Sequence, residues 1–375
     1  MIVYLVLTVV TVVLSLFVKK DNNTLSYGYS RQQVMNGLCL LSIFILLFAV
    51  SALRLNVGND YATYCEYFHL IRCKLTTETI VPTEPGFNLV CLIIYFISGC
   101  TENYLLMFAV FGGVTIFLFV KAMSRQSDWF FLSFFLFMSF GYYFQSFSTI
   151  RYYLVLAMAV AAIPFVLSKQ WFKFILVILL GAFFHKSLLL VLPLYFLAQI
   201  NWKKYQLAII AVLCASLVFF KPWLMKLFLI LYPTYEGTEY LETGSISWIN
   251  VIRCAGVLVL ALLLYKKAVK DDRRMKFYFY CNLEALAVYL CLSFLPFVSR
   301  IGHYLSITQI LFIPALIKRI ENKKLRRLLL AGVLIAGTAY LLIYLIKKAP
   351  TDGVRVLPYQ TFLFHDMVNI LSDVS

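Results

Sequence analysis

Charged side chains are scarce in this chain. They make up 13% of its 375 residues, whereas 62% of the residues are hydrophobic. In soluble globular domains about 25% of residues are charged. The shortage excludes an ordinary water-soluble domain. The apolar residues also occur in continuous blocks, not in the alternating pattern of a membrane β-barrel.

Acidic residues are the rarer sign of charge: the chain has 17 Asp and Glu against 33 Lys and Arg, for a net charge of +16. Such an excess can indicate nucleic-acid binding. Here, however, the densest basic clusters, 266–276 and 318–327, are short loops between apolar runs. Lys and Arg are enriched in the cytoplasmic loops of membrane proteins. The positive charge therefore predicts membrane orientation, and no nucleic-acid partner is expected.

Carboxylates are nearly absent from the apolar runs themselves, with Glu284 as the exception. Ion-coupled transporters place such groups near the middle of the membrane, so a transporter is disfavoured. The chain also lacks the His/Cys spacing of a zinc site, a glycine-rich phosphate loop and a Gly-x-Ser-x-Gly elbow. Its nine cysteines show no paired spacing.

Long apolar runs are what the chain has instead. A helix of about 17–25 apolar residues can cross a membrane. The succession of runs predicts an all-α, polytopic integral membrane helical bundle of about 12 transmembrane helices, with one domain over 1–375. Phe87–Ser98 is shorter, follows Pro85 and Gly86, and ends at Gly99, which predicts a re-entrant or interfacial helix near 86–98. The expected spans are 1–18, 34–53, 103–120, 129–147, 149–167, 171–184, 187–200, 206–220, 248–265, 277–297, 303–318 and 327–346.

The basic loops predict which ends of the spans face the cytoplasm. With the N-terminus outside, the inside loops hold 21 of the 33 Lys and Arg residues. The long loops 54–86 and 221–247 and the tail 347–375 then lie outside, and loops of this length are more often functional than short connectors. The apolar segment 356–362 of the tail is expected to fold back onto the bundle. The inside loops are 19–33, 121–128, 168–173, 201–205, 266–276 and 318–327.

Five polar residues at span ends fall on the outer face in this topology: Arg54, Asp60, Arg151, His185 and Arg300. The flat guanidinium fork of arginine pairs with phosphate oxygens. The alternative for Arg54 and Arg151 is a helix-end side chain that only reaches towards water, and for Arg300 it is an ordinary polar helix start. For Asp60 the alternative is a turn residue.

Two of these positions also predict chemistry on sugars. Histidine titrates close to neutral pH and suits the removal of a hydroxyl proton, although His185 at a helix break is also a common structural position. If residues around Arg300 are helical, His303 and Tyr304 share its face and could line a sugar-diphosphate cleft. Arg253, near the outer end of its span, is a weaker candidate.

The ordered set of motifs resembles the EpsG-like branch of the Wzy-type polysaccharide polymerases over nearly the whole chain. One departure is Tyr152, where the family often has glutamine. The motifs are Arg54, Gly58, Asp60-Tyr61 and Tyr64, then Glu84-Pro85-Gly86-Phe87, Ile150-Arg151, Phe184-His185-Lys186-Ser187, Arg300 with Tyr304, and Pro358-Tyr359.

The resemblance implies a membrane glycosyltransferase of the bacterial inner membrane that joins oligosaccharide repeat units carried on undecaprenyl diphosphate at the outer face. Its partners would be a lipid-linked donor and acceptor and membrane lipid, with a chain-length regulator as a further candidate; no cofactor or metal is implied. Arg54, Arg151 and Arg300 would stabilise the diphosphate leaving group, and His185 or Asp60 would take the acceptor proton. The expected substrate-binding set is completed by Tyr61, Tyr64, Glu84, Arg253, His303, Tyr304 and Tyr359.

Three rival functions use similar features. A ligase of the O-antigen type takes the same donor but a different acceptor. A repeat-unit flippase would need a charged cavity at mid-span, which the chain mostly lacks. A membrane acyltransferase would need its histidine on the inner face, opposite to the side expected for His185.

Overall fold

The computed structural model describes residues 1–20, 30–74, 84–217, 219–231, 246–295 and 298–364. All the regular elements in these ranges are helical, and one isolated β-bridge joins Arg54 to Thr361. Five helical segments are long and apolar enough to cross a membrane: Arg31–Ala52, Tyr104–Gln126, Ile150–Leu167, Val298–Lys318 and Lys323–Lys348. The chain is therefore an all-α polytopic membrane protein, as predicted.

The chain packs as two compact units. The first comprises Met1–Ala162, Leu176–Leu188 and Ile320–Ser375; the second comprises Ile163–Ile175 and Leu189–Arg319. Both boundaries near residues 162 and 176 fall inside helices, α8 (Ile150–Leu167) and α9 (Trp171–Ala182).

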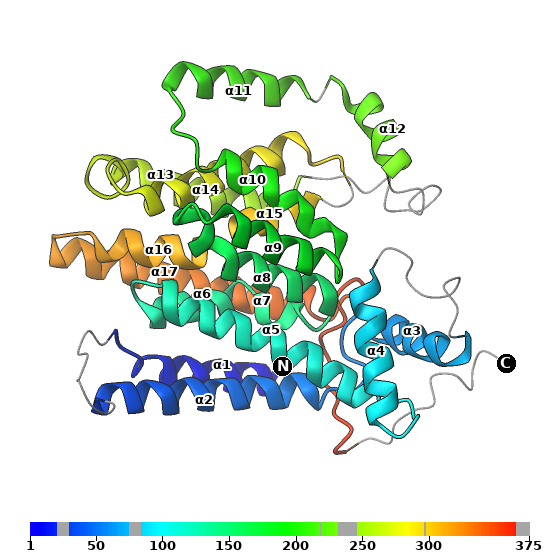
Figure 1. The fold of residues 1–375 in the computed structure, drawn as a ribbon. Helices are drawn as coiled ribbons and strands as arrows, with labels where there is room; N and C mark the ends of the chain where they lie inside the picture. Colours follow the sequence, from blue (N-terminus) through cyan, green and yellow to red (C-terminus); the bar gives the residue numbers. More distant parts are fainter. Residues whose placement is uncertain (21–29, 75–83, 218, 232–245, 296–297, 365–375) are drawn as a thin grey trace. The chain divides into compact units, whose positions relative to one another are not determined.

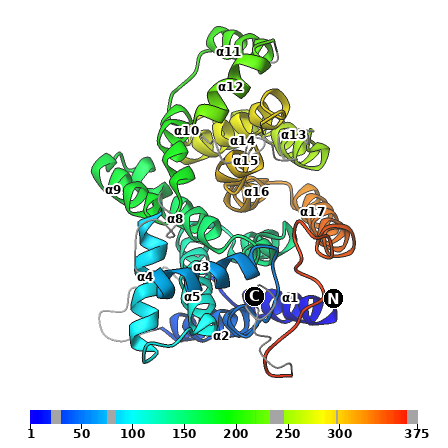
Figure 2. The same ribbon diagram turned by 90° about the vertical axis from the view of Figure 1, so that its right-hand side faces the viewer.

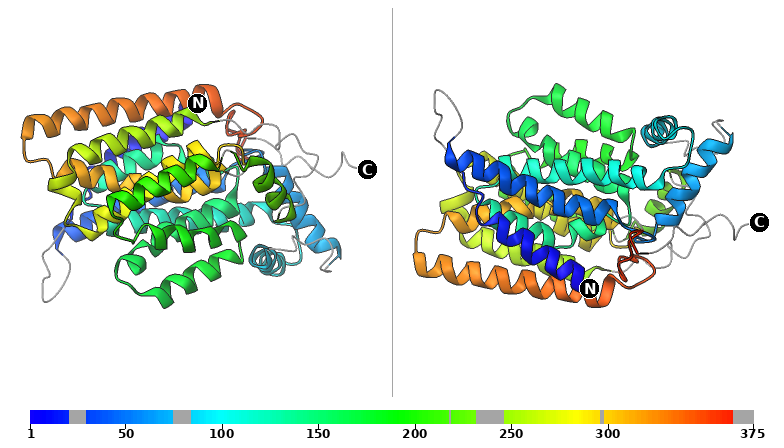
Figure 3. Two further views of the ribbon diagram at one scale, coloured as in Figure 1. Left: turned by 90° about the horizontal axis from the view of Figure 1, so that it is seen from above. Right: turned by 90° about the horizontal axis from the view of Figure 1, so that it is seen from below.

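The first unit is built around α2 (Arg31–Ala52), which packs against α1 (Ile2–Ser15) and α5 (Tyr104–Gln126). Figure 3 shows α1 and α2 side by side. Ser30 and Gln33 form a capping box that satisfies backbone donors at the start of α2. The other helices of this unit are α3 (Tyr61–Lys74), α4 (Pro85–Ile97), α6 (Phe130–Ser139), α7 (Tyr142–Gln145) and α17 (Lys323–Ile343).

The second unit is built around α14 (Arg273–Cys291), which packs against α13 (Trp248–Leu263), α15 (Val298–Ser306) and α16 (Gln309–Lys318). Figure 1 shows α13 and α14 side by side. Within this core Gln309 donates to the amide oxygen of Asn282 at 2.7 Å, and the Asn282 amide nitrogen donates to Cys254 O at 3.0 Å. The unit also contains α10 (Val191–Leu197), α11 (Lys204–Ser216) and α12 (Lys221–Leu231).

Several predicted spans are interrupted. The expected span 129–147 is divided into α6 and α7 because Gly141 takes a left-handed conformation, φ 76°, which ends the first helix. The expected span 303–318 starts earlier and divides into α15 and α16. The expected outer loops contain helices α3 and α12; residues 75–83 and 232–245 lie outside the described ranges.

Helix α4 is short, as its sequence predicted. Pro85 occupies its first turn, where no backbone donor is lost, and Gly99 follows its end with a positive φ. Its 13 residues extend about 20 Å at 1.5 Å per residue, less than the roughly 30 Å of a hydrocarbon core. Where α2 is seen nearly end-on, α4 lies across the view (Figure 2).

The C-terminal tail folds back onto the first unit, which confirms that expectation from its sequence. The backbone N–H of Leu55 donates to Gln360 O at 2.9 Å, and that of Gly58 donates to Arg355 O at 2.7 Å. Tyr4 anchors the same segment through a hydrogen bond to Val356 O at 2.8 Å. The tail therefore orders the loop that follows α2.

Gly58 is required where the loop after α2 packs against the backbone of Phe147. Its φ is 104°, and an added Cβ would lie 2.2 Å from the carbonyl oxygen of Phe147. We expect Gly58→Ala to lower the free energy of unfolding by at least about 1–3 kcal/mol, the cost of a strained backbone conformation. Thermal unfolding in detergent measures the change.

Gly37→Ala is the matched control, because nothing lies within 4 Å of an added Cβ there. It should leave stability unchanged or raise it slightly, since glycine inside a helix is about 0.5–1 kcal/mol worse than alanine. Equal stability of the two variants would contradict the close approach of Gly58 to Phe147.

Candidate functional site

An ion pair between Arg151 and Glu84 forms the centre of the candidate site. Arg151 Nη1 donates to Glu84 Oε2, and the side chains are 15% and 6% exposed. Arg151 is the second residue of α8, and Glu84 is the residue immediately before α4. The pair therefore joins two helix starts that are 67 positions apart in the sequence.

Aromatic rings surround the Arg151 guanidinium. Its carbon Cζ lies 5.3 Å from the ring centroid of Tyr64, 5.7 Å from that of Tyr67 and 5.2 Å from that of Phe87. A guanidinium within about 6 Å of a ring face is attracted to its electrons. Burial is the main cause that raises the pKa of Tyr64, so this phenol stays neutral beside the cation.

His185 lies on the other side of Glu84. Its Nδ1 is 3.8 Å from Glu84 Oε1, and the ring packs edge-on against Tyr152 with centroids 5.7 Å apart. Ser187 contacts the same nitrogen twice, through its backbone N–H at 3.2 Å and its hydroxyl at 2.8 Å. One carboxylate therefore contacts both an arginine and a histidine.

Gly86 allows these helix starts to come together. Its N–H donates to Phe183 O at 2.8 Å, and an added Cβ would lie 2.9 Å from that oxygen. The contact joins the start of α4 to the segment that carries His185. The sequence pattern Glu84-Pro85-Gly86 thus supplies an acid, a helix start and a close backbone approach.

Arg54 is buried in a neighbouring part of the first unit, with 2% of its surface exposed. Its guanidinium lies between the rings of Phe108 and Phe147, at 4.7 and 4.9 Å, and Nη1 donates to Ser51 O at 2.5 Å and to Ser51 Oγ at 2.9 Å. Its Nε and Nη2 have no hydrogen-bond partner among the described residues. Arg54 is therefore not a helix-end side chain that reaches water.

Burial lowers the pKa of Arg54 to about 10, and the nearby phenol of Tyr61 acts in the opposite direction. The side chain therefore keeps its charge at neutral pH. Tyr359, from the tail, is near the same cation and donates to Val50 O at 3.0 Å.

The remaining predicted residues of the first unit connect these two arginines. Tyr61 stacks on Phe108 at 4.4 Å, and Tyr64 meets the same ring edge-on at 6.5 Å. Phe108 therefore contacts both Arg54 and the tyrosines of α3. Asp60 precedes α3, close enough to Tyr64 to raise the pKa of its phenol.

The other predicted residues belong to the second unit. Arg300, His303 and Tyr304 all lie on α15, which confirms the helix that places them on one face. Tyr304 is fully buried, and its backbone oxygen accepts from the Tyr195 hydroxyl at 2.9 Å. Arg253, on α13, donates to Ser306 Oγ at 3.3 Å.

Tyr67, Ser51 and Phe147 were not singled out from the sequence, and Phe87 and Ser187 were quoted only as members of motifs. Tyr67 and Phe87 complete the rings around Arg151, Ser187 orients His185, and Ser51 and Phe147 hold Arg54. Ser187 follows His185 by two positions, a spacing that could have indicated the contact. The aromatic residues carried no such signal, since 17% of the chain is aromatic. In the described ranges, no three His, Cys, Asp or Glu side chains cluster to hold a metal.

The helices and the charged cluster at their ends define a polytopic membrane protein with a built polar site. A model of the EpsG family matches residues 37–361, and the chain belongs to this family. That membership supports a polymerase-type role in polysaccharide biosynthesis. No curated protein and no solved structure matches the chain.

The buried ion pair yields a stability prediction. Glu84→Ala leaves the Arg151 charge without its carboxylate, which should lower the unfolding free energy by about 3–5 kcal/mol. In the Glu84→Ala/Arg151→Ala chain the loss should be smaller than the sum of the single losses. Unfolding in mixed micelles measures the three variants.

The Asp272–Arg319 pair offers a comparison, since its side chains are 34% and 27% exposed. Arg319→Ala should cost about 1 kcal/mol or less, because exposed pairs contribute little. Strictly additive effects of the Glu84 and Arg151 substitutions would show that the two charges do not stabilise each other.

Proposed function

We propose that this protein polymerises oligosaccharide repeat units carried on undecaprenyl diphosphate, at the outer face of a bacterial inner membrane. The observation that carries the proposal is Arg151: a largely buried guanidinium that is surrounded by aromatic side chains and held by Glu84, the carboxylate that also contacts His185. Aromatic faces pack against sugar rings, and a guanidinium fork pairs with phosphate oxygens. Family membership supports the reaction class.

The reaction forms one bond and breaks another. The hydroxyl oxygen of the acceptor unit attacks the anomeric carbon of the donor chain, and the bond from that carbon to the diphosphate oxygen breaks. The electron pair goes to the diphosphate, and a base takes the hydroxyl proton. Negative charge develops on the leaving group, so fixed positive charges beside it stabilise the transition state.

Arg151 is the guanidinium that we assign to the diphosphate. The phosphate oxygens would replace Glu84 as its partner, and the carboxylate would then be released towards His185. Arg54 is buried beneath the loop after α2 and the C-terminal tail. Its charge would therefore act through Phe108, the ring that also contacts the tyrosines of α3. For Arg300, in the second unit, a role at a diphosphate rests on its position in the family pattern alone.

The contacts of His185 indicate which residue donates a hydrogen bond to the leaving group and which takes the acceptor proton. The Ser187 N–H points at Nδ1, which therefore accepts a hydrogen bond and leaves the proton of the neutral ring on Nε2. In this form His185 donates a hydrogen bond to the leaving diphosphate. Asp60, near Tyr64 at the start of α3, is then the base that takes the acceptor proton.

Alanine at Arg151 tests the function in cells. We expect polymer yield to fall by roughly 10²–10³-fold, the effect of removing one charge-stabilising donor. Lipid-linked glycans from the variant strain should then accumulate as single repeat units. Arg125→Ala is the control, because Arg125 is an exposed cation at the end of α5.

Polymer of normal length and yield in the Arg151→Ala strain, with the protein at normal level in the membrane, would contradict the proposal. Loss of transfer of chains that are already long would instead indicate a ligase. Glu84→Gln separates positioning from charge: it should change polymer length less than Arg151→Ala does, since Arg151 remains.

The outer location of the site has its own test. Cys100 is exposed, just after α4, where the proposed topology places it outside. A membrane-impermeant maleimide should label the protein in intact cells, and Cys100→Ala should remove most of this labelling. Lys266→Cys in the Cys100→Ala background should react only after the membrane is permeabilised. Labelling with the reverse pattern would place the site on the cytoplasmic side.

A further inference from the structure

A cavity of about 550 Å³ lies within the second unit, where the start of α9, the end of α10 and the start of α14 meet. None of the residues that line it belongs to the site around Arg151. The lining residues are Lys169, Trp171, Phe196, Ala198, Gln199, Ile200, Asn201, Asp271, Arg273, Lys276, Phe277 and Tyr280.

The polar side of this cavity is positively charged. Lys169, Arg273 and Lys276 line it, against the single carboxylate of Asp271. Arg273 and Lys276 are three positions apart on α14, as helix neighbours on one face are. The cavity therefore attracts an anion.

Hydrogen-bond donors remain available in the lining. Arg273 donates from Nε and Nη2 to Gln199 Oε1, at 3.1 and 2.6 Å, which holds the guanidinium in place. Its Nη1, the Lys169 ammonium and the amide Nε2 of Gln199 have no hydrogen-bond partner among the described residues. Lys276 makes one long contact, 3.4 Å, with Asn201 Oδ1.

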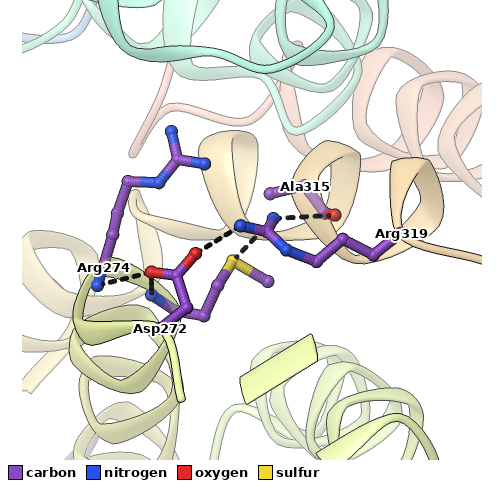
Figure 4. A network of polar contacts seen from close by, with 5 residues as sticks. Asp272, Arg274, Ala315 and Arg319 are labelled. Carbon is purple, nitrogen blue, oxygen red and sulfur yellow. Dashed lines mark hydrogen bonds and ion pairs between the residues drawn. The ribbon is translucent and has the colours of Figure 1, made fainter. Parts of the chain in front are cut away.

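A nearby second carboxylate is already engaged elsewhere. Asp272 caps α14 by accepting from the backbone N–H groups of Arg274 and Met275, and Arg319 at the end of α16 donates to its other oxygen. Figure 4 shows the Asp272 carboxylate turned to Arg319, with the Arg274 guanidinium pointing away. Asp272 therefore fixes the start of α14 and does not neutralise the cations of the cavity, which can bind a ligand.

The other side of the cavity is aromatic and apolar. Trp171 and Phe196 pack with ring centroids 5.8 Å apart, and Phe196 is 54% exposed. Trp and Tyr side chains are enriched where a membrane helix passes from hydrocarbon to headgroups. A phosphate site beside these aromatic side chains fits a lipid headgroup whose acyl chains are still attached.

The sequence places this cavity at the cytoplasmic surface. Its cations come from 168–173 and 266–276, two loops assigned to the inside by their charge. Anionic lipids give the cytoplasmic leaflet a negative surface potential, and basic pockets between helices bind their headgroups.

We propose that this cavity binds the phosphate group of an anionic phospholipid, with Lys169, Arg273 and Lys276 on the phosphate and Trp171 and Phe196 along the start of the acyl chains. This site is separate from the polymerase site proposed above and does not depend on it. A free phosphate compound offers the same anionic group but no acyl chains, so it makes no use of the aromatic wall.

The test uses the full chain in neutral detergent. Dioctanoyl phosphatidylglycerol and dioctanoyl phosphatidylcholine are titrated separately, and bound lipid is counted by native mass spectrometry. We expect the anionic lipid to bind more tightly. Lys169→Gln/Lys276→Gln should weaken it by roughly tenfold to thirtyfold, the effect of two lost cation contacts at a membrane surface.

Lys266→Gln/Lys270→Gln is the matched control, since both lysines are exposed in the same basic loop and neither lines the cavity. It should retain the affinity of the unchanged chain. Lys169→Glu gives a second test at an exposed position, and it should weaken binding of the anionic lipid without lowering the unfolding temperature.

Equal loss of binding in the cavity and control variants would overturn the proposal, because charge anywhere in the loop would then suffice. Equal affinity for the two lipids would also overturn it. Inorganic phosphate and glycerol phosphate, added in excess, should displace little lipid. If they bind as tightly as the phospholipid, the ligand is a free phosphate compound and the lipid assignment is wrong.

Discussion

A charge that is removed from water must be matched by a partner, and this constraint organises the first unit. Arg151 is held by Glu84, and Glu84 also contacts His185, so the starts of α4 and α8 and the segment after α9 converge on one carboxylate. Removing one member of a buried pair costs about 3–5 kcal/mol. The site and the packing of these three segments therefore depend on the same interaction.

Arg54 meets the constraint in a different way. Among the described residues no carboxylate pairs with it and two of its donor nitrogens have no partner; two aromatic rings, the oxygens of Ser51 and a set of tyrosines surround it. A cation over a ring gains about 0.5–2 kcal/mol, which only partly offsets the loss of hydration. The C-terminal tail covers this residue, so the ends of the chain help to keep a charge inside the first unit.

In the second unit, charged residues with different contacts lie next to each other at the start of α14. Asp272 is committed to the start of α14 and to Arg319, whereas Arg273 and Lys276 line a cavity. The adjacent residues Asp272 and Arg273 therefore have different roles: Asp272 stabilises the helix start, and Arg273 can bind a ligand. Both the Arg151 cluster and this cavity combine cations with aromatic rings, the combination expected of sites for phosphate groups attached to lipid or sugar.

The sequence by itself determined the membrane class, the short helix α4, the return of the tail and the family resemblance, because these follow from apolar length, Pro and Gly positions and local motifs. It also named Arg151, His185 and Glu84 as site residues. Only the tertiary structure decided that Glu84 joins the other two, that Arg54 is buried, and that helices break at Gly141 and between α15 and α16. Such facts depend on side chains distant in sequence, and hydropathy along the chain carries no record of which polar groups become neighbours.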